Sequence, residues 1–431
     1  MPPMVVIDSS IHDGGGQLLR NAISFSCVLR RPVTITRFRS QRNPPGLRPP
    51  HVACLDHVLQ LCPAASIEGA EVGSQEVVFR AWDCPAPPEP GRGCGRGQRH
   101  YVVDVNPGAI TLVFHAALVP LLFAPTADST TVTYLGCTDA SNAPPVDYVS
   151  EVFLKVIRAA TRRPRSGGAA AAAAVPKLAE VEVLKRVVGI RDGGAAKMTV
   201  YPLRSLPALE LLDRGRPERI RGRVFYSRKA SKRAAEAARK EALRAISERF
   251  ARAQSPPPPS AHGNPADRTA LPSADVMIDL VRDTNCRGDM DGISAFLWLE
   301  TTSQVVMAGF SVSSGAGGLE DEAAYSAIGL TAAEQLIRNW DQGGCVDEYL
   351  QDQLIYLMAL ADGVSKVLTG PLTPHTRGGI YVSEKMTEAR FTVEPAGGIV
   401  GKVFAEPGVD DGKTLDDPRA IGAHKPQSAL Y

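Results

Sequence analysis

The chain has 431 residues, of which 44% are hydrophobic, so it is long enough to form two or more globular domains with cores of their own. Its 48 Lys and Arg residues nearly balance 46 Asp and Glu residues and leave a net charge of +2. This balance excludes a strong basic field over the whole surface. Any nucleic acid must therefore be bound by a local patch or by a pocket for a chain end.

The eight cysteines are scattered and include no CxxC pair. Cys54, His57 and Cys62 come nearest to a metal-binding set, but their spacing fits no zinc pattern, and their apolar helical surroundings favour core packing. Reduced thiols indicate an intracellular protein. The N-terminal residues lack the basic and apolar regions of a signal peptide, and no apolar run approaches membrane-spanning length. We expect no membrane partner, and the sequence does not indicate an oligomeric state.

The first expected element is a buried strand at residues 4–8, followed by the glycine-rich turn DGGGQ and a helix. Such a turn can bring the backbone N–H groups of a helix start close to a phosphate, although it is more often purely structural. Arg20 follows the glycines by one helical turn. We therefore expect its side chain to face the same pocket.

The next expected strand covers residues 33–38 and leads into a turn rich in proline, glycine and arginine before a second helix. Arg39, Arg42, Arg48 and His51 surround this turn. Four cationic or potentially cationic groups suit an anion such as phosphate, which arginine can bind through two hydrogen bonds. A solvated basic loop is an equally good interpretation of the segment by itself.

The middle of the chain contains low-complexity segments and a separate α/β pattern. Residues 84–100, 161–176 and 254–273 are rich in Pro, Gly, Ala or Arg and are expected to be loops or linkers. Residues 205–305 show a strand, a strongly basic helix and further strands around Thr301–Ser303. The basic face could contact RNA, but charged helix faces are more often simply solvated.

The stretch 343–386 carries the most specific pattern. Tyr349, Asp352 and Gln353 precede an apolar run at helical spacing, so they lie in the first turns of an expected helix, where free N–H groups and the helix dipole favour an anion. A short strand follows, and then His375 in the turn TPHTRGG. A histidine in a polar turn is usually an ordinary surface residue, but loops on a rigid scaffold also carry catalytic groups.

This C-terminal stretch, DEYLQDQLIYLMALADGVSKVLTGPLTPHT, closely resembles the signature of the RNA 3'-terminal phosphate cyclases. The segments DGGGQLLR, RSQRNPPGLRPPH, EGAEVGSQEVVF and GCTDASNAPPVDY resemble further motifs of that family. The resemblance implies an α+β fold of three repeated β-α-β-α-β-β units, similar to enolpyruvyl transferases, with a small inserted α/β domain. It places the first part of the body at 1–204, the insert at 205–305 and the last part of the body at 306–431.

The resemblance also implies a function in RNA processing. A cyclase of this family is a ligase that uses ATP and a divalent metal ion, Mg²⁺ or Mn²⁺, to convert the 3'-terminal phosphate of RNA into a 2',3'-cyclic phosphate by nucleotidyl transfer. His375 corresponds to the nucleophile that takes AMP from ATP. The expected partner is an RNA 3' end, and the expected location is the nucleus (nucleoplasm) or the cytoplasm. No metal ligands can be assigned.

The remaining site residues follow from the same resemblance, motif by motif. The residues expected to bind ATP are Tyr349, Leu350, Gln351, Asp352, Gln353, His115 and Pro144. Those expected to bind phosphate or the RNA end are Asp13, Arg20, Arg39, Arg42 and His51.

The chain departs from the family pattern at several points. Asp13 replaces a glutamate, Pro50 replaces a glutamine, and His115 replaces a glutamine that contacts the nucleotide. Residues 188–197 resemble their family motif least. These departures bear more on the range of RNA substrates than on the nucleotide chemistry.

Two other interpretations remain open. The first is a catalytically decayed, cyclase-like protein that acts in RNA processing or ribosome biogenesis through protein contacts. The catalytic-histidine motif around His375 argues against it, whereas the departures from the family pattern favour it. The second is an enolpyruvyl transferase, which shares the repeated unit but would not need a histidine nucleophile beside an ATP-binding segment.

Overall fold

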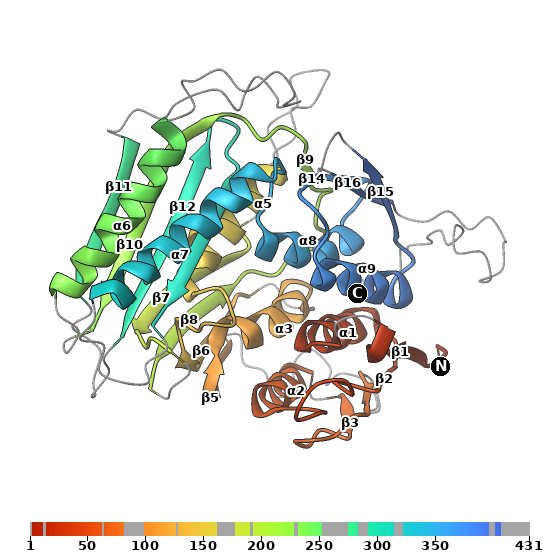
Figure 1. The fold of residues 1–431 in the computed structure, drawn as a ribbon. Helices are drawn as coiled ribbons and strands as arrows, with labels where there is room; N and C mark the ends of the chain where they lie inside the picture. The colour runs from red at the N-terminus through yellow and green to blue at the C-terminus, as the bar shows by residue number, and fades with distance from the viewer. Residues whose placement is uncertain are drawn as a thin grey trace.

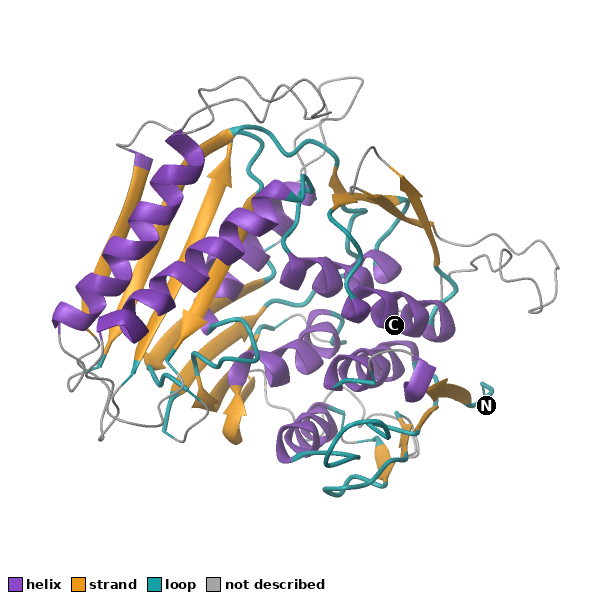
Figure 2. Ribbon diagram, viewed as in Figure 1, coloured by secondary structure: helices purple, strands orange, loops and turns teal. Residues whose placement is uncertain are grey.

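A computed structural model describes residues 2–11, 14–62, 64–81, 99–125, 128–161, 177–189, 193–227, 232–251, 275–282, 292–313, 322–395 and 401–406. Within them the chain forms four four-stranded sheets with helices packed against them, which confirms the expected mixed α+β class (Figures 1 and 2). Asp13, most of the three low-complexity segments and residues 190–192 of the least family-like motif lie outside the described residues.

The first sheet has the order β1-β2-β4-β3 and contains the two strands expected near the N-terminus. Its strands are β1 (Val5–Asp8), β2 (Val33–Thr36), β3 (Ser66–Glu68) and β4 (Val77–Arg80), and its helices are α1 (Gly16–Leu29) and α2 (Pro49–Leu61), after a short 3-10 turn, η1 (Ser9–Ile11). β1 and β2 are parallel, whereas β4 pairs antiparallel with β2 and β3. Alternating burial along β1 and β2 shows that one face of the sheet meets the helices.

The second sheet has the order β5-β6-β8-β7. Its elements are β5 (Arg99–Ala109), α3 (Ile110–Leu122), β6 (Thr130–Cys137), a continuous helical stretch of α4 (Val146–Tyr148), η2 (Val149–Phe153) and α5 (Leu154–Ala160), and then β7 (Ala179–Lys185) and β8 (Ala195–Val200). α3 is apolar on nearly every side and almost completely buried, as expected for a helix in the middle of a protein. It therefore offers its few polar side chains to the interior.

The third sheet has the order β15-β16-β14-β9. It contains β9 (Glu210–Leu211), β14 (Ser365–Thr369), β15 (Arg390–Pro395) and β16 (Gly401–Glu406), and its helices are α8 (Glu348–Leu360) and α9 (Pro374–Met386). β9 and β14 are parallel, and the pairs β14–β16 and β15–β16 are antiparallel. The first three sheets thus share one series of pairings, a parallel pair followed by two antiparallel pairs.

The fourth sheet lies between β9 and α8 in the sequence and has the order β11-β10-β12-β13. Its elements are β10 (Pro217–Tyr226), α6 (Lys232–Ala251), β11 (Val276–Arg282), β12 (Ile293–Thr301), β13 (Val306–Val312) and α7 (Glu322–Asp341). Helices α6 and α7 lie side by side over one face of this sheet (Figure 1). Because β12 and β13 pair along their length, the sheet continues past residue 305, the expected end of the inserted domain.

Helices from the first three sheets meet in the centre of the molecule. α1 packs against α3 and α9, α2 packs against α3, and α8 packs against α9 (Figures 1 and 2). Their apolar faces join one continuous core that also includes the sheets. Residues that are far apart in the sequence, on α1, α2, α3 and α8, can therefore face one another here.

Candidate active site

The glycine-rich start of α1 makes room for two polar side chains. A Cβ atom added at Gly16 would lie 2.6 Å from Nε2 of His51 and 2.9 Å from Nη1 of Arg20. Glycine is therefore required for the His51 ring and the Arg20 guanidinium to lie this close to the helix start. The expectation that Arg20 faces the glycine turn is confirmed.

His51 sits in the first turn of α2, and its Nδ1 accepts a hydrogen bond of 2.9 Å from the backbone N of Arg48. In the neutral ring this contact leaves the proton on Nε2. Burial, followed by the charges of Arg20, Arg39 and Arg48, lowers the pKa of His51 to about 3. With this pKa His51 is neutral at physiological pH, so it would act as a hydrogen-bond donor and not as one of the cations of the basic turn.

The arginines of the Pro/Gly turn have different exposures. Arg39 is half-buried in a left-handed backbone conformation, with φ 51°, and it acts on the pKa of His51. Arg42 is exposed on the same turn, where its backbone N donates to the carbonyl of Arg39 at 3.0 Å. The structure thus brings Arg20, Arg39 and His51 together and leaves Arg42 at the surface.

A cluster of buried ionisable groups, here called the Arg20 cluster, extends from Arg20 toward α3 and α8. Burial raises the pKa of Asp352 to about 7, although the charge of Arg20 and a hydrogen bond with Gln17 oppose this shift. Burial, followed by the charge of Arg20, lowers the pKa of His115 to about 3. The pKa of Tyr356 is raised by burial and by Asp352. Three helices, α1, α3 and α8, therefore contribute ionisable groups to this cluster.

Several polar atoms in and beside the Arg20 cluster are shielded from solvent and have no hydrogen-bond partner among the described residues. They are Oε1 of Gln17, both ring nitrogens of His115 and the hydroxyl of Tyr356. A buried polar group without a partner costs free energy, so groups of this kind tend to serve a ligand. Perturbed pKa values at Asp352 and His115 point to the same cluster. A ligand rich in hydrogen-bonding groups, such as a nucleotide, would fit these side chains.

The N-terminus of α8 has a protein anion of its own. The carboxylate of Asp347 accepts hydrogen bonds from the backbone N atoms of Tyr349, at 3.1 Å, and Leu350, at 2.8 Å. It also accepts from the Tyr148 hydroxyl at 2.6 Å and from the backbone N of Ala308 at 3.0 Å. The expectation that free N–H groups of this helix start would bind an anion is therefore wrong for these two amides.

The consecutive residues expected to bind ATP point in different directions. The Tyr349 hydroxyl accepts from Nε2 of Gln335, on α7, at 2.9 Å, and its ring lies 4.8 Å from that of Phe310, on β13. Leu350 is completely buried in the core. Gln353 is buried, and its Oε1 has no partner among the described residues. Of these residues, Asp352 is the one whose side chain interacts with Arg20.

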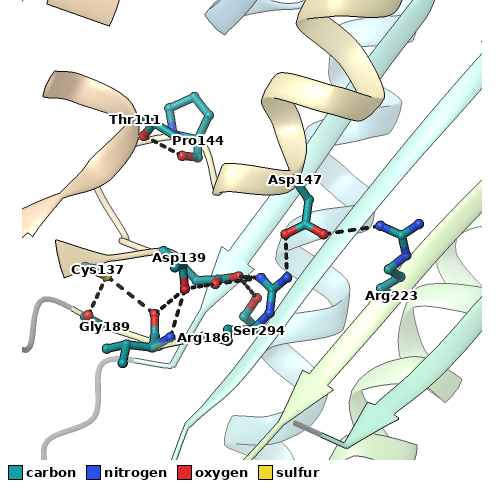
Figure 3. Close-up of polar contacts among 11 residues, drawn as sticks. Thr111, Cys137, Asp139, Pro144, Asp147, Arg186, Gly189, Arg223 and Ser294 are labelled. Carbon is teal, nitrogen blue, oxygen red and sulfur yellow. Dashed lines mark hydrogen bonds and ion pairs between the residues drawn. The ribbon is translucent and has the colours of Figure 1, made fainter. Parts of the chain in front are cut away.

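Pro144 belongs to a segment that polar contacts hold from several sides (Figure 3). Its carbonyl accepts a hydrogen bond of 2.9 Å from Thr111, which lies one helical turn before His115 on α3. Asp139 and Asp147, on either side of Pro144, both accept from the guanidinium of Arg186, at 2.8 Å and 2.7 Å. The structure thus places Pro144 beside the helix that carries His115.

Two residues of the fourth sheet complete this network, and sequence reasoning missed both. Ser294, on β12, donates to Asp139 at 2.6 Å, and Arg223, on β10, donates to Asp147 at 3.2 Å (Figure 3). Arg186 also stacks on the ring of Phe225, at 3.6 Å from the ring centroid. No local pattern marks these residues, because their partners are far away in the sequence.

His375 is exposed and belongs to the first helical turn of α9. The expectation that it lies in an irregular turn between a strand and the next element is therefore wrong. The helix starts early because Thr373 caps it by accepting from the backbone N of Thr376 at 3.1 Å, and because Pro374 occupies the first helical position. The short strand expected before this segment is confirmed as β14.

The described residues contain no group of three or more His, Cys, Asp or Glu side chains that could hold a metal ion. Cys54 and His57 are buried, and Nε2 of His57 lies 3.0 Å from the Tyr134 hydroxyl, which confirms that they pack in the core. In the described part of the chain, every helix is too short or too polar to span a bilayer.

Comparison with known proteins decides the family. Residues 11–393 match the RNA 3'-terminal phosphate cyclase family. The chain belongs to this family. A probable RNA 3'-terminal phosphate cyclase of Dictyostelium discoideum is 29% identical over 398 residues, which cover 91% of this chain and 79% of that protein.

Two RNA 3'-terminal phosphate cyclases are similar over the same share of the chain. That of Pyrobaculum aerophilum is 30% identical over 398 residues, covering 91% of this chain and 96% of the relative. That of Drosophila melanogaster is 30% identical over 398 residues, covering 91% of this chain and 94% of the relative. The resemblance inferred from the motifs is therefore confirmed, and the relatives are named for a ligase-type enzyme.

Proposed function

We propose that the chain is an ATP-dependent RNA 3'-terminal phosphate cyclase, which converts the 3'-phosphate of RNA into a 2',3'-cyclic phosphate. The family match over residues 11–393 carries this proposal. The Arg20 cluster supports it, because it combines a buried cation with buried polar atoms that lack partners among the described residues. An intracellular location, in the nucleus or the cytoplasm, stays a prediction.

We further propose that the body consists of three repeated β-α-β-α-β-β units. The shared order of parallel and antiparallel pairings in the first three sheets supports this arrangement. The fourth sheet then belongs to an inserted domain that starts near residue 205. Pairing of β12 with β13 and packing of α7 on α6 favour an insert that continues past residue 305 to the end of α7.

The proposed reaction starts at His375. A neutral ring nitrogen attacks the α-phosphorus of ATP, the bond to the bridging oxygen breaks, and pyrophosphate leaves while a phosphoramidate forms. An oxygen of the RNA 3'-phosphate then attacks the same phosphorus, the P–N bond breaks, and the ring regains its free nitrogen. Finally the 2'-OH loses its proton and attacks the 3'-phosphorus, which expels AMP. This last step is intramolecular, so proximity lowers its barrier.

The described residues suggest roles for the other groups. Arg20 and Arg39 would stabilise phosphate charge, and neutral His51 would donate a hydrogen bond from Nε2. His115 and Asp352 would contact the nucleotide in the Arg20 cluster, with Pro144 beside them. Because no three ligating side chains come together among the described residues, Mg²⁺ or Mn²⁺ would enter with the phosphates of ATP. Asp13 and Arg42 remain proposed contacts of the RNA end.

Incubation with ATP labelled at the α-phosphate tests the central proposal. The wild-type protein should acquire an acid-labile label, and His375→Ala should acquire none. Arg377→Ala, which changes another exposed residue of α9, is the matched control and should label normally. Undiminished label on His375→Ala would refute the assignment. A wild-type protein that takes up no label would favour the decayed, non-enzymatic alternative.

A further inference from the structure

The side chain of Gln351 joins α8 to the segment that precedes His375. It is 5% exposed, so its contacts are made inside the protein. Its Oε1 accepts from the backbone N of Thr373 at 2.9 Å and from the hydroxyl of Thr376 at 2.6 Å. Its Nε2 donates to the Thr369 hydroxyl and to the carbonyl of Pro371, at 3.2 Å, with the carbonyl of Gly370 at 3.4 Å. One amide therefore binds both ends of residues 369–376.

These contacts fix the orientation of the amide group. A backbone N can only donate, so the atom that faces Thr373 must be the oxygen. The carbonyls of Gly370 and Pro371 can only accept, so the atom that faces them must be the nitrogen. Exchange of the two amide atoms would break contacts on both sides.

The same contacts use the whole hydrogen-bonding capacity of the side chain. A primary amide offers two N–H donors and two acceptor lone pairs, and all four are engaged within the protein. No donor or acceptor of Gln351 is left for a nucleotide. Its expected role as an ATP-binding side chain does not fit this geometry.

The segment held by Gln351 sets the position of the proposed nucleophile. Thr369 ends β14, Thr373 caps α9, and Thr376 lies in the first turn of that helix. The Thr373 and Thr376 hydroxyls also lie 2.9 Å apart. His375 lies between these two threonines, so the contacts that fix them fix the backbone from which its imidazole projects.

We propose that Gln351 is a positioning residue that holds the first turn of α9 so that His375 meets the α-phosphate, and that its side chain does not bind ATP. The proposal rests on the proposed function for its catalytic meaning. Leucine at this position would keep the volume but leave the Thr373 amide and the Pro371 carbonyl without their partner. Glutamate would keep both acceptors and lose both donors.

Single-turnover labelling with α-labelled ATP tests this proposal in Gln351→Leu, Gln351→Glu and wild type. In Gln351→Leu the maximal rate should fall by roughly tenfold or more, because a displaced first turn of α9 no longer aligns His375 with the α-phosphate. The ATP concentration that gives half of this rate should stay within about twofold of wild type, since uniform binding is untouched. The maximal rate of Gln351→Glu should lie between those of wild type and Gln351→Leu. A higher half-saturating concentration at an unchanged maximal rate would overturn the proposal and make Gln351 an ATP ligand.

Hydrogen exchange of the 369–376 peptide supplies a readout that does not need activity. Gln351→Leu should increase exchange in this peptide while the peptides of β10 and β12 stay as in wild type. Unchanged exchange would overturn the positioning role whether or not the protein labels. Absence of label on the wild-type protein would instead contradict the proposed function alone. Thr376→Val removes one contact to Gln351 and is the milder variant if Gln351→Leu does not fold.

Discussion

Around Arg186 the buried charges of Asp139 and Asp147 have partners on every side, whereas around Arg20 several buried polar atoms have none among the described residues. Both regions are polar and lie inside the protein. The first is complete without a ligand, and it joins the second sheet to the fourth through Ser294 and Arg223 (Figure 3). Complete pairing is typical of a structural network, and incomplete pairing is typical of a binding site.

The largest expected effect comes from breaking the complete network. Arg186→Met leaves two buried carboxylates without their shared cation, so the free energy of unfolding should fall by about 3–5 kcal/mol. Urea denaturation followed by circular dichroism measures this change. Arg219→Met is the matched control, since Arg219 is 45% exposed and its partner Glu300 also pairs with Lys155, and it should cost less than about 1 kcal/mol. Equal losses in both variants would contradict the structural role of the Arg186 network.

The loss of stability at low pH should depend on His115, which belongs to the Arg20 cluster and not to the Arg186 network. Burial and Arg20 lower the pKa of His115 from 6.5 to about 3, so between these values the unfolded chain binds a proton that the folded chain does not. Stability from this group is therefore lost as the pH falls from 6.5 toward 3. Glutamine does not titrate, so between pH 6.5 and about pH 4.5 the free energy of unfolding of His115→Gln should fall by about 2–3 kcal/mol less than that of wild type.

Urea midpoints at the two pH values measure this difference. The pKa of Asp352 is raised to about 7, so this group adds stability as the pH falls. Because both proteins contain Asp352, its contribution cancels in the comparison. Parallel pH profiles of wild type and His115→Gln would show that His115 is not buried in its neutral form.

Loss of the Arg20 cation should lower the rate of adenylylation more than it lowers the stability of the fold. Arg20→Met should lower the rate of adenylylation by roughly 10–150-fold, because a hydrogen bond to a charged group contributes about 1.5–3 kcal/mol. Its urea midpoint should change less than that of Arg186→Met, since Asp352 can become neutral when Arg20 is lost. Labelling rates and midpoints of the two variants test this. Normal labelling of Arg20→Met would show that Arg20 does not take part in adenylylation.

The smallest effect is expected at the edge of the site. Arg42 is exposed and Arg39 is half-buried near His51, so Arg39→Ala should lower the rate of RNA cyclisation more than Arg42→Ala. Salt screens exposed charges, and the Arg42→Ala effect should disappear as ionic strength rises. Cyclisation of a 3'-phosphorylated oligonucleotide at low and high salt tests both statements. An equal, salt-insensitive loss in the two variants would contradict the difference in burial.

Much of the local structure could be predicted because it depends on local patterns. The apolar residues 4–8 predicted β1, alternation of apolar residues predicted β2, and helical spacing of apolar residues predicted α8. The start of α9 was missed because the turn-like residues Thr373 and Pro374 also suit a helix cap and its first position. The ion network around Arg186 could not be predicted, since its members meet only after folding: they come from the segments after β6 and β7, from α4, and from β10 and β12.

The sequence by itself determined the family and much of the local secondary structure. Only the tertiary structure decided which neighbours the side chains of Tyr349–Gln353 meet, because successive residues of a helix point about 100° apart. Tyr349 faces α7, Gln351 faces the start of α9, and Asp352 faces Arg20. The charge states of His51 and His115 were decided in the same way, since burial and arginines from other parts of the chain set their pKa values.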